Sequence, residues 1–301
     1  MNSRLVASLQ PLRRRTFLLH GAAATAALVG CATPASRTPL RFVTGPFRPT
    51  EAETRALWSP LAMHVGSQLR RDIEFLVRPE WPQVGEAMLR QEADVAWMGG
   101  AWRYALARSQ GLGPAIATVR FAGQPTYRAI IIARRGLDAA GFPDAASGRS
   151  ISFTHDTSTT GWLVPYAWLV QRGIDPRTHF RYSAAAQHPE NELKVARGEV
   201  DFATDHDNNR NAMIARGQVD AEAVPIVWTS DPVPQDPIAV RAGLDPTLTA
   251  RLQDIFSAID VVQGQAIPMP PGYNGFVRAS HADYAGVMRA GELAGRLPKA
   301  T

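Results

Sequence analysis

The chain has 301 residues, of which 45% are hydrophobic and 20% charged, and this is the composition of an ordinary folded protein with one or two compact lobes. The formal net charge is +5, but four arginines precede residue 31, and setting them aside leaves 28 basic against 27 acidic residues. A nucleic-acid-binding protein keeps its basic excess in its folded part, so this class of partner is excluded.

The first 30 residues have the pattern of an export signal and not of a folded element. A basic run at Arg13, Arg14 and Arg15 is followed by an apolar stretch, residues 17–30, which is too short and too rich in alanine for a membrane span. Residues 14–18 resemble the twin-arginine signature of the Tat route. Residues 28–31 resemble a lipobox, whose cysteine is acylated after cleavage. We therefore expect a Tat-type lipoprotein signal peptide over residues 1–30.

Cys31 is the only cysteine, so no intrachain disulfide can form. Its place at the expected cleavage position predicts that it carries the lipid, and a buried bystander thiol is the alternative. Residues 31–39 are rich in small residues, threonine and proline, which predicts a flexible lipid-attached tether. The sequence thus predicts a periplasmic or other extracytoplasmic protein that is held at a membrane by its lipid anchor alone.

From Leu40 onward, short apolar runs alternate with longer amphipathic ones, which predicts an α/β protein with a largely parallel sheet. The expected strands are residues 40–43, 73–77, 95–97, 115–119, 129–133, 150–153, 202–204, 224–228 and 237–240. The expected helices are residues 51–69, 81–90, 101–108, 161–172, 190–197, 208–216, 246–259 and 281–294. Thr50 caps the first helix, whose stripe of Trp58, Leu61 and Val65 we expect in the core.

The most informative segment is residues 153–165, where a predicted strand leads into a run of hydroxyl side chains and then into a helix. The run consists of Thr157, Ser158, Thr159 and Thr160. Free backbone N–H groups at a helix start, the positive end of the helix dipole and several hydroxyl donors together suit a tetrahedral oxyanion. A plain helix cap needs only one hydroxyl, so the run of four favours an anion site.

At this segment the chain resembles the periplasmic phosphate, phosphite and phosphonate binding proteins of ABC importers. In that family a segment like Asp-Pro-x-Ser-Thr-Ser-Gly opens the second lobe and cradles the phosphorus oxygens, and residues 157–161 stand in its place. Other similar segments follow in family order, at residues 41–49, 51–60, 78–81, 95–99, 124–127, 200–204 and 227–237.

The resemblance implies the type II fold of two-lobed periplasmic binding proteins, in which each lobe is a sheet flanked by helices. Lobe 1 would comprise residues 40–130 and 231–301, and lobe 2 residues 131–230. Two crossing strands, near residues 130–133 and 228–240, would form the hinge, with the ligand held in the cleft between the lobes.

The resemblance also implies ligand-binding roles for individual residues. Ser158, Thr159 and Thr160 would donate to the oxyanion, and Tyr127 would add a phenolic hydroxyl from the other lobe. Trp81 stands where the family often has a tyrosine, and its indole can supply an N–H or a wall but cannot accept a hydrogen bond.

Two further positions concern the rest of the ligand. His188 takes the place of a family histidine that faces the ligand, although a histidine on a surface loop is the alternative. Relatives that bind an amino-alkyl ligand use two acids. The position of the first acid is occupied by Asn208, with Asp207 beside it, and the second acid is present as Asp236. Only one of the two acids of the ammonium pocket is therefore present.

Other polar residues support weaker hypotheses. Asp205, His206 and Asp207 carry metal-ligand atoms, but neighbouring positions rarely converge on one ion and no His-x-x-x-His spacing occurs, so we expect neither a metal nor another cofactor.

Arg103 lies in a segment that departs from the family pattern. Its guanidinium would pair bidentately with phosphonate or carboxylate, and we rank it below the hydroxyl run.

The sequence therefore predicts a monomeric, non-enzymatic protein that binds a small phosphorus oxyanion and delivers it to an ABC permease with its ATPase. A sensory lipoprotein for another small anion is one alternative. A serine hydrolase is another, with Ser158 as nucleophile, His188 as base and Asp205 or Asp236 as the orienting acid. The chain has no Gly-x-Ser-x-Gly elbow, which disfavours the hydrolase.

Overall fold

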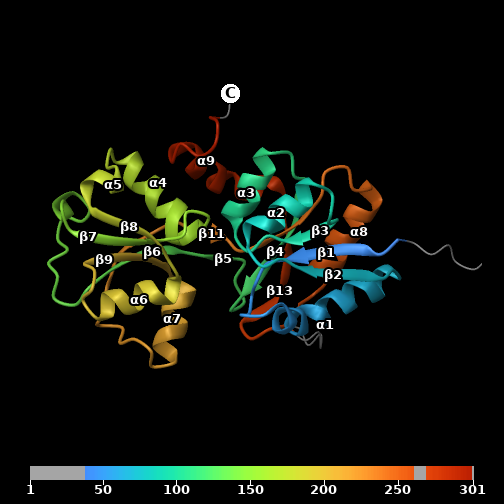
Figure 1. Cartoon of the computed structure of the whole chain (residues 1–301), viewed down its shortest axis with the longest axis horizontal. Coiled ribbons are helices and arrows are strands. Elements are labelled where there is room, and N and C mark those ends of the chain that lie inside the picture. Colours follow the sequence, from blue (N-terminus) through green and yellow to red (C-terminus); the bar gives the residue numbers. More distant parts are fainter. Residues whose placement is uncertain (1–37, 261–268, 300–301) are drawn as a thin grey trace, which may run out of the picture. The chain divides into compact units, whose positions relative to one another are not determined.

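The computed structural model describes residues 38–260 and 269–299, which form helices packed on the faces of two β-sheets (Figure 1). The predicted signal peptide, Cys31 and most of the predicted tether lie outside these residues. Among the described helices, none is long and apolar enough to cross a membrane.

The first sheet has six strands in the order β13-β4-β12-β3-β1-β2. Their bounds are β1 Leu40–Thr44, β2 Ile73–Val77, β3 Val95–Trp97, β4 Ala115–Phe121, β12 Pro237–Val240 and β13 Tyr273–Arg278. Helices α1 (Glu51–Leu69) and α8 (Pro246–Ser257) pack together against one side of this sheet. Helices α2 (Pro82–Leu89) and α3 (Ala101–Ser109) belong to the core on the other side (Figure 1).

Helix α1 begins and ends where its sequence predicts. The Thr50 hydroxyl accepts the backbone N–H of Glu53, and the Glu53 carboxylate accepts the N–H of Thr50, so the capping box satisfies donors at the helix start. Trp58, Leu61 and Val65 are all buried in the hydrophobic core, as their spacing predicts. Such burial contributes about 2 kcal/mol per large apolar side chain and fixes α1 on the sheet.

The second sheet has five strands in the order β10-β6-β9-β7-β8. Their bounds are β6 Ala129–Ala133, β7 Ser150–Thr154, β8 Arg181–Ala186, β9 Phe202–His206 and β10 Ile226–Thr229. Helices α4 (Val164–Gln171) and α5 (Pro176–His179) lie on one face, and α6 (His188–Ala196) and α7 (Asp207–Ala215) lie on the other (Figure 1). The last helix, α9 (Ala285–Leu293), contacts both α3 and α4.

Both sheets are mixed, so the prediction of a largely parallel sheet is wrong. The β1–β2, β1–β3, β7–β8 and β7–β9 pairs are parallel, but β6, β12 and β13 enter their sheets antiparallel to their neighbours. The reason lies in the passages from β4 to β6 and from β10 to β12. They contain no helix and carry the chain from one sheet into the other, so β6 and β12 enter their sheets from the neighbouring sheet and not through a helical crossover.

These two passages pair with each other as a short antiparallel ribbon of β5 (Thr126–Tyr127) and β11 (Val233–Pro234). The segment near residues 130–133, which we expect to cross between the lobes, is β6 of the five-stranded sheet and follows β5 of the ribbon directly. Strand β8 escaped prediction because it is a mostly exposed edge strand without an apolar run. Three short helical turns complete the described elements, namely η1 (Asp144–Ala146), the π-helical η2 (Thr159–Leu163) and η4 (His281–Tyr284).

Candidate functional site

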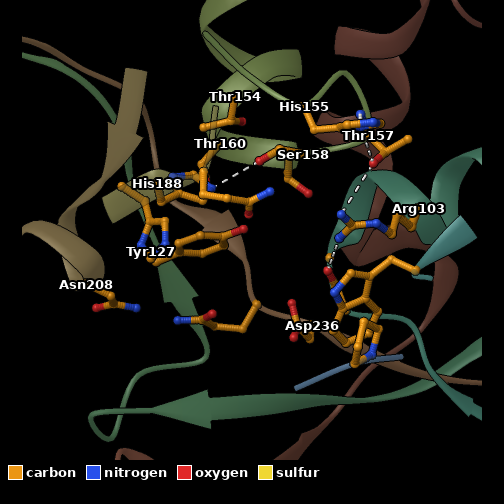
Figure 2. A pocket seen from close by; sticks show the side chains of 18 of the residues that line it. Arg103, Tyr127, Thr154, His155, Thr157, Ser158, Thr160, His188, Asn208 and Asp236 are labelled. Carbon is orange, nitrogen blue, oxygen red and sulfur yellow. Dashed lines mark hydrogen bonds between the residues drawn. The ribbon is translucent and has the colours of Figure 1, made fainter. Parts of the chain in front are cut away.

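A cavity of about 600 Å³ lies beside the β5–β11 ribbon and is lined by residues from the elements of both sheets (Figure 2). Each ligand residue that the sequence predicts lines this cavity, and these are Trp81, Tyr127, Thr157, Ser158, Thr159, Thr160, His188, Asn208 and Asp236. The predicted lipidation residue, Cys31, lies outside the described residues. The structure thus gathers segments far apart in the sequence around one space.

The hydroxyl run forms the start of a helix, as its sequence predicts, but that start is a π-helical turn. Ser158 is the N-cap, and its Oγ accepts the N–H of Gly161 at 3.1 Å. The N–H of Leu163 donates to the carbonyl of Ser158, five residues back, at 3.0 Å, and the turn continues into α4. The first N–H groups of a helix have no partner within it and lie at the positive end of its dipole.

Gly161 allows this turn to lie against its neighbours. A Cβ at this position would lie 2.1 Å from Oγ1 of Thr154 and 2.7 Å from Cε1 of His188. Any other residue would therefore push the turn away from the end of β7 and from the imidazole. The glycine that follows the hydroxyl run is a packing requirement of the site.

The hydroxyls of the run have different surroundings. Thr159 is buried, and its Oγ1 accepts the backbone N–H of Trp102 at 2.9 Å, which ties the turn to α3. Oγ1 of Thr157 accepts from the guanidinium of Arg103 at 3.3 Å. Thr160 lies next to the phenol of Tyr127, whose pKa is raised by burial, so the phenol stays a neutral donor. Figure 2 shows Ser158, Thr160 and Tyr127 around the same space.

His188 connects the turn to a buried carboxylate. Its Nε2 lies 3.2 Å from Oγ of Ser158, and its Nδ1 lies 2.7 Å from Oδ1 of Asp205, which is fully buried. Burial, with the charge of Arg103, lowers the pKa of His188 to about 4. The neutral ring therefore donates Nδ1–H to the carboxylate, and its Nε2 accepts the hydroxyl proton of Ser158.

A second buried acid lies beneath this chain of contacts. Glu192 of α6 is fully buried, and within the described residues neither of its carboxyl oxygens has a hydrogen-bond partner of ordinary geometry. Burial and the facing carboxyl group of Asp205 raise the pKa of Glu192, and burial raises the pKa of Asp205 as well. Two carboxyl groups that face each other away from water retain one proton between them.

The ligand atoms of His188, Asp205 and His206 lie within 4.8 Å of one another, a separation that could suit a metal ion. Hydrogen bonds already occupy most of these atoms. Nδ1 of His206 accepts the N–H of Asn209 at 3.2 Å as the N-cap of α7, so its ring proton is on Nε2. A protonated Nε2 offers a hydrogen bond to an anion and no lone pair to a metal.

The opposite side of the cavity comes from the elements of the six-stranded sheet. Trp81 forms a wall there, with its ring edge-to-face against Phe47 at 5.0 Å between centroids. Oδ2 of Asp236 accepts the indole N–H of Trp97 at 2.9 Å. Burial raises the pKa of Asp236, while this hydrogen bond and the charge of Arg103 act in the opposite direction. In Figure 2, Arg103 and Asp236 lie on the side away from Asn208.

The sequence did not single out several lining residues. Thr154, Gln235 and Tyr273 line the cavity, and no local pattern marked them because each follows or lies within an ordinary strand or loop segment. Three buried polar atoms of lining residues lack a hydrogen-bond partner within the described chain, namely Nε of Arg103, Oγ1 of Thr154 and Nε2 of Gln235. Unpaired buried polar groups are costly, and a bound polar ligand would satisfy them.

Comparison with known proteins adds a family to this geometry. Residues 47–284 match the family model described as the periplasmic phosphonate substrate-binding protein of ABC transporters. The phosphonates-binding periplasmic protein of Escherichia coli K12 is 25% identical over 203 residues, which cover 66% of this chain and 60% of that protein. The phosphate-import protein PhnD of Mycolicibacterium smegmatis is 25% identical over 218 residues, 68% of this chain and 67% of that one.

The chain thus aligns with less than two thirds of the length of the E. coli relative. Among solved structures, PhnD1 of Prochlorococcus marinus in complex with methylphosphonate superposes with a TM-score of 0.68 at 14% identity, over 86% of this chain and 98% of that one. This likeness shows that the fold is the two-lobed fold of periplasmic binding proteins.

Proposed function

Because the chain belongs to the family of periplasmic phosphonate substrate-binding proteins of ABC transporters, we propose that its cavity binds a small phosphorus oxyanion, that is a phosphonate, phosphite or phosphate. The bound anion would be delivered to an ABC permease with its ATPase. The names of the two curated relatives, one phosphonate-binding and one phosphate-importing, support this class of ligand without choosing within it.

The π-helical turn is the observation that carries the proposal. It brings Thr160, the free N–H groups of a helix start and the N–H side of its dipole to one end of the cavity, where Ser158 holds the turn against His188. Tyr127 contributes a neutral phenol, and His206 an Nε2–H. Neutral donors of this kind bind the oxygen atoms of a tetrahedral oxyanion whether it carries one negative charge or two.

We further propose that the ligand is enclosed when two lobes close, with lobe 1 at residues 40–130 and 231–301 and lobe 2 at residues 131–230. The division of strands between the six-stranded and five-stranded sheets supports these bounds. Closure would remove water from the anion and strengthen each hydrogen bond to it.

Calorimetric titration of the purified chain tests the proposal, with phosphate, phosphite, methylphosphonate, 2-aminoethylphosphonate and sulfate as ligands. We expect saturable binding of at least one phosphorus oxyanion and a loss of about 100-fold in affinity in the Ser158→Ala/Thr160→Val double variant. Binding of sulfate alone, or an affinity that the double variant leaves unchanged, would refute it.

A serine hydrolase is the second candidate, since Ser158, His188 and Asp205 make the two contacts of a catalytic triad. The Oγ of Ser158, however, also accepts the N–H of Gly161, which weakens it as a nucleophile. Incubation with p-nitrophenyl acetate and p-nitrophenyl phosphate separates the two functions. We expect no p-nitrophenol release above that of a Ser158→Ala variant, and turnover that this variant abolishes would favour the hydrolase.

For the N-terminal segment we propose export by the Tat route and lipid attachment at Cys31, as the order of its motifs indicates. The anchored protein would be periplasmic, like its family, and would act as a monomer. Metabolic labelling with a radioactive fatty acid tests the anchor. Label in the wild-type chain that is lost in Cys31→Ala supports it, and equal labelling of both chains, or of neither, contradicts it.

A further inference from the structure

Arg103 is a partly buried cation that lines the cavity in addition to the neutral donors around the π-helical turn. It is the third residue of α3, and its guanidinium lines the cavity. One nitrogen donates to the carbonyl of Gly99 and another to Oγ1 of Thr157 at 3.3 Å. Within the described residues it forms no ion pair, and its Nε, although buried, has no hydrogen-bond partner. The charge of Asp236 acts on this guanidinium without an ion pair between them, and a buried cation that lacks a direct ion-pair partner is costly unless an anion binds to it.

The surroundings of Arg103 hold its guanidinium in place. The guanidinium carbon lies 5.3 Å from the ring centroid of Trp81, a cation–π distance. Trp81 in turn fills space that two glycines leave free. A Cβ would lie 2.4 Å from the indole at Gly45 and 2.0 Å from it at Gly99. A long side chain that is fixed in this way loses little rotamer freedom when it binds a ligand.

The charges that face the cavity bear on the kind of ligand. The titratable lining groups are Glu80, Arg103, Tyr127, His155, His188, His206, Asp236 and Tyr273. His188 is neutral at pH 7 because its pKa is lowered to about 4. Oδ2 of Asp236 accepts from Trp97, and burial raises the pKa of this carboxyl group while the positive charge of Arg103 acts in the opposite direction. Asn208, near the far end, is an uncharged amide. An ammonium group would therefore meet a guanidinium and two carboxyl groups, of which Glu80 is exposed to water and Asp236 already accepts from Trp97, and it would gain little.

We propose that Arg103 binds the oxyanion directly and makes this cavity select phosphorus oxyanions that carry no cationic substituent, such as alkylphosphonates, over aminoalkylphosphonates. Trp81 acts as the positioning residue for this guanidinium. The inference rests on the proposed function, because it specifies which phosphorus oxyanions the same cavity prefers. The positive charge stabilises the anion and repels an ammonium group on the same molecule.

Calorimetric titration with methylphosphonate and 2-aminoethylphosphonate tests this selectivity in the wild-type chain and in Arg103→Met, which keeps the apolar stem and removes the charge. We expect the wild type to bind methylphosphonate at least about 10-fold more tightly. In Arg103→Met we expect methylphosphonate to bind about 10- to 100-fold more weakly and the ratio of the two affinities to fall toward one. Arg103→Lys keeps the charge and should keep the preference.

Arg172→Met is the matched control. Arg172 also lies over a tryptophan, at 4.9 Å from the ring of Trp168, but it is exposed and outside the cavity. The Arg172→Met variant should leave the affinities for methylphosphonate and 2-aminoethylphosphonate unchanged. Equal weakening of both ligands in Arg103→Met, or wild-type preference for the aminophosphonate, would overturn this inference while leaving the proposed function intact. Failure of the wild type to bind any phosphorus oxyanion would overturn both.

Discussion

The hydroxyl run on the five-stranded-sheet side of the cavity consists of neighbouring residues, whereas the cation, the acid and the indole wall on the six-stranded-sheet side come from separate segments. Residues 157–160 follow β7, and His188 begins α6 after the neighbouring strand β8. On the other side, Trp81, the segment from Gly99 to Arg103, and Asp236 come from three separate parts of the chain. The first side offers mainly neutral donors, and the second offers a cation, an acid and an indole wall.

Under the proposed function, this difference would give the two sides separate tasks. Hydroxyl, amide and imidazole N–H groups suit any tetrahedral oxyanion, so the five-stranded-sheet side would determine the class of ligand. Fixed charges and a rigid wall distinguish among members of that class, so the six-stranded-sheet side would determine selectivity. Variants on the two sides should therefore change different measured quantities, overall affinity on one and the ratio of affinities on the other.

The largest effect is expected from Gly99→Ala, which tests how rigid the wall is. The new Cβ would lie 2.0 Å from the Trp81 ring, at a φ of +61°. We expect the free energy of unfolding to fall by about 3 kcal/mol in urea denaturation, and methylphosphonate to bind at least about 10-fold more weakly. Gly136→Ala is the control, since it has a φ of +74° and open space around it, and should cost only about 1 kcal/mol. Equal losses in both variants would show that the wall yields easily.

Asp205→Asn tests the chain of contacts on the opposite side. An amide in place of this carboxylate no longer fixes the ring proton of His188 on Nδ1, so the imidazole and the turn that it contacts at Ser158 lose their fixed positions. We expect the affinity for all phosphorus oxyanions to fall by about 10- to 100-fold, with their ratios unchanged. Asp201→Asn removes a carboxylate that binds Arg134 and Ser150, away from the cavity, and should leave the calorimetric affinities unchanged. A selective loss for one ligand in Asp205→Asn would contradict the division of tasks.

Glu192→Gln tests the buried acid pair through the dependence of stability on pH. Because the folded state raises the pKa of Glu192, its contribution is fully present below the usual pKa of about 4.5 and is lost as pH rises through the raised value. Asp205 shifts in the same direction, whereas His188 and His206 have lowered pKa values and titrate below this window. The wild-type free energy of unfolding should fall between about pH 7 and pH 9, by up to about 1 kcal/mol per pH unit.

In Glu192→Gln this decline should be smaller, as measured by urea denaturation at several pH values. Glu199→Gln, which changes an exposed glutamate just after the same helix, should decline like the wild type. An unchanged slope in Glu192→Gln would mean that this carboxyl group is already ionised at pH 7.

The smallest effect is expected from Tyr127→Phe, which removes one neutral donor on the ribbon between the two sides. Loss of one neutral hydrogen bond should weaken methylphosphonate binding by only a few-fold, about 1 kcal/mol. Tyr182→Phe removes a phenol whose oxygen accepts from Trp162 at 2.9 Å outside the cavity, and should not change binding. A loss of 100-fold in Tyr127→Phe would instead place this phenol at the centre of recognition.

Much of the five-stranded-sheet side could be predicted from sequence because its chemistry is local. The hydroxyl run, Gly161 and the apolar strand before them specify a helix start that faces the end of a sheet, and the structure differs mainly in its π-helical geometry. The place of His188 followed from a family resemblance and not from its own neighbours. Its partner Asp205 lies on β9, and Glu192 lies on α6. The two acids face each other only because α6 packs over β9.

The sequence by itself determined the α/β layering and most element bounds, since apolar periodicity and helix capping act over a few residues, and the family resemblance implied most of the predicted lining residues. Only the tertiary structure decided the mixed sheets, the pairing of the two acids beneath His188 and the position of the Arg103 guanidinium. Each of these depends on contacts between residues far apart in the chain. Gly45 and Gly99 leave the space for Trp81, and Trp81 then holds the guanidinium, a dependence that no local pattern encodes.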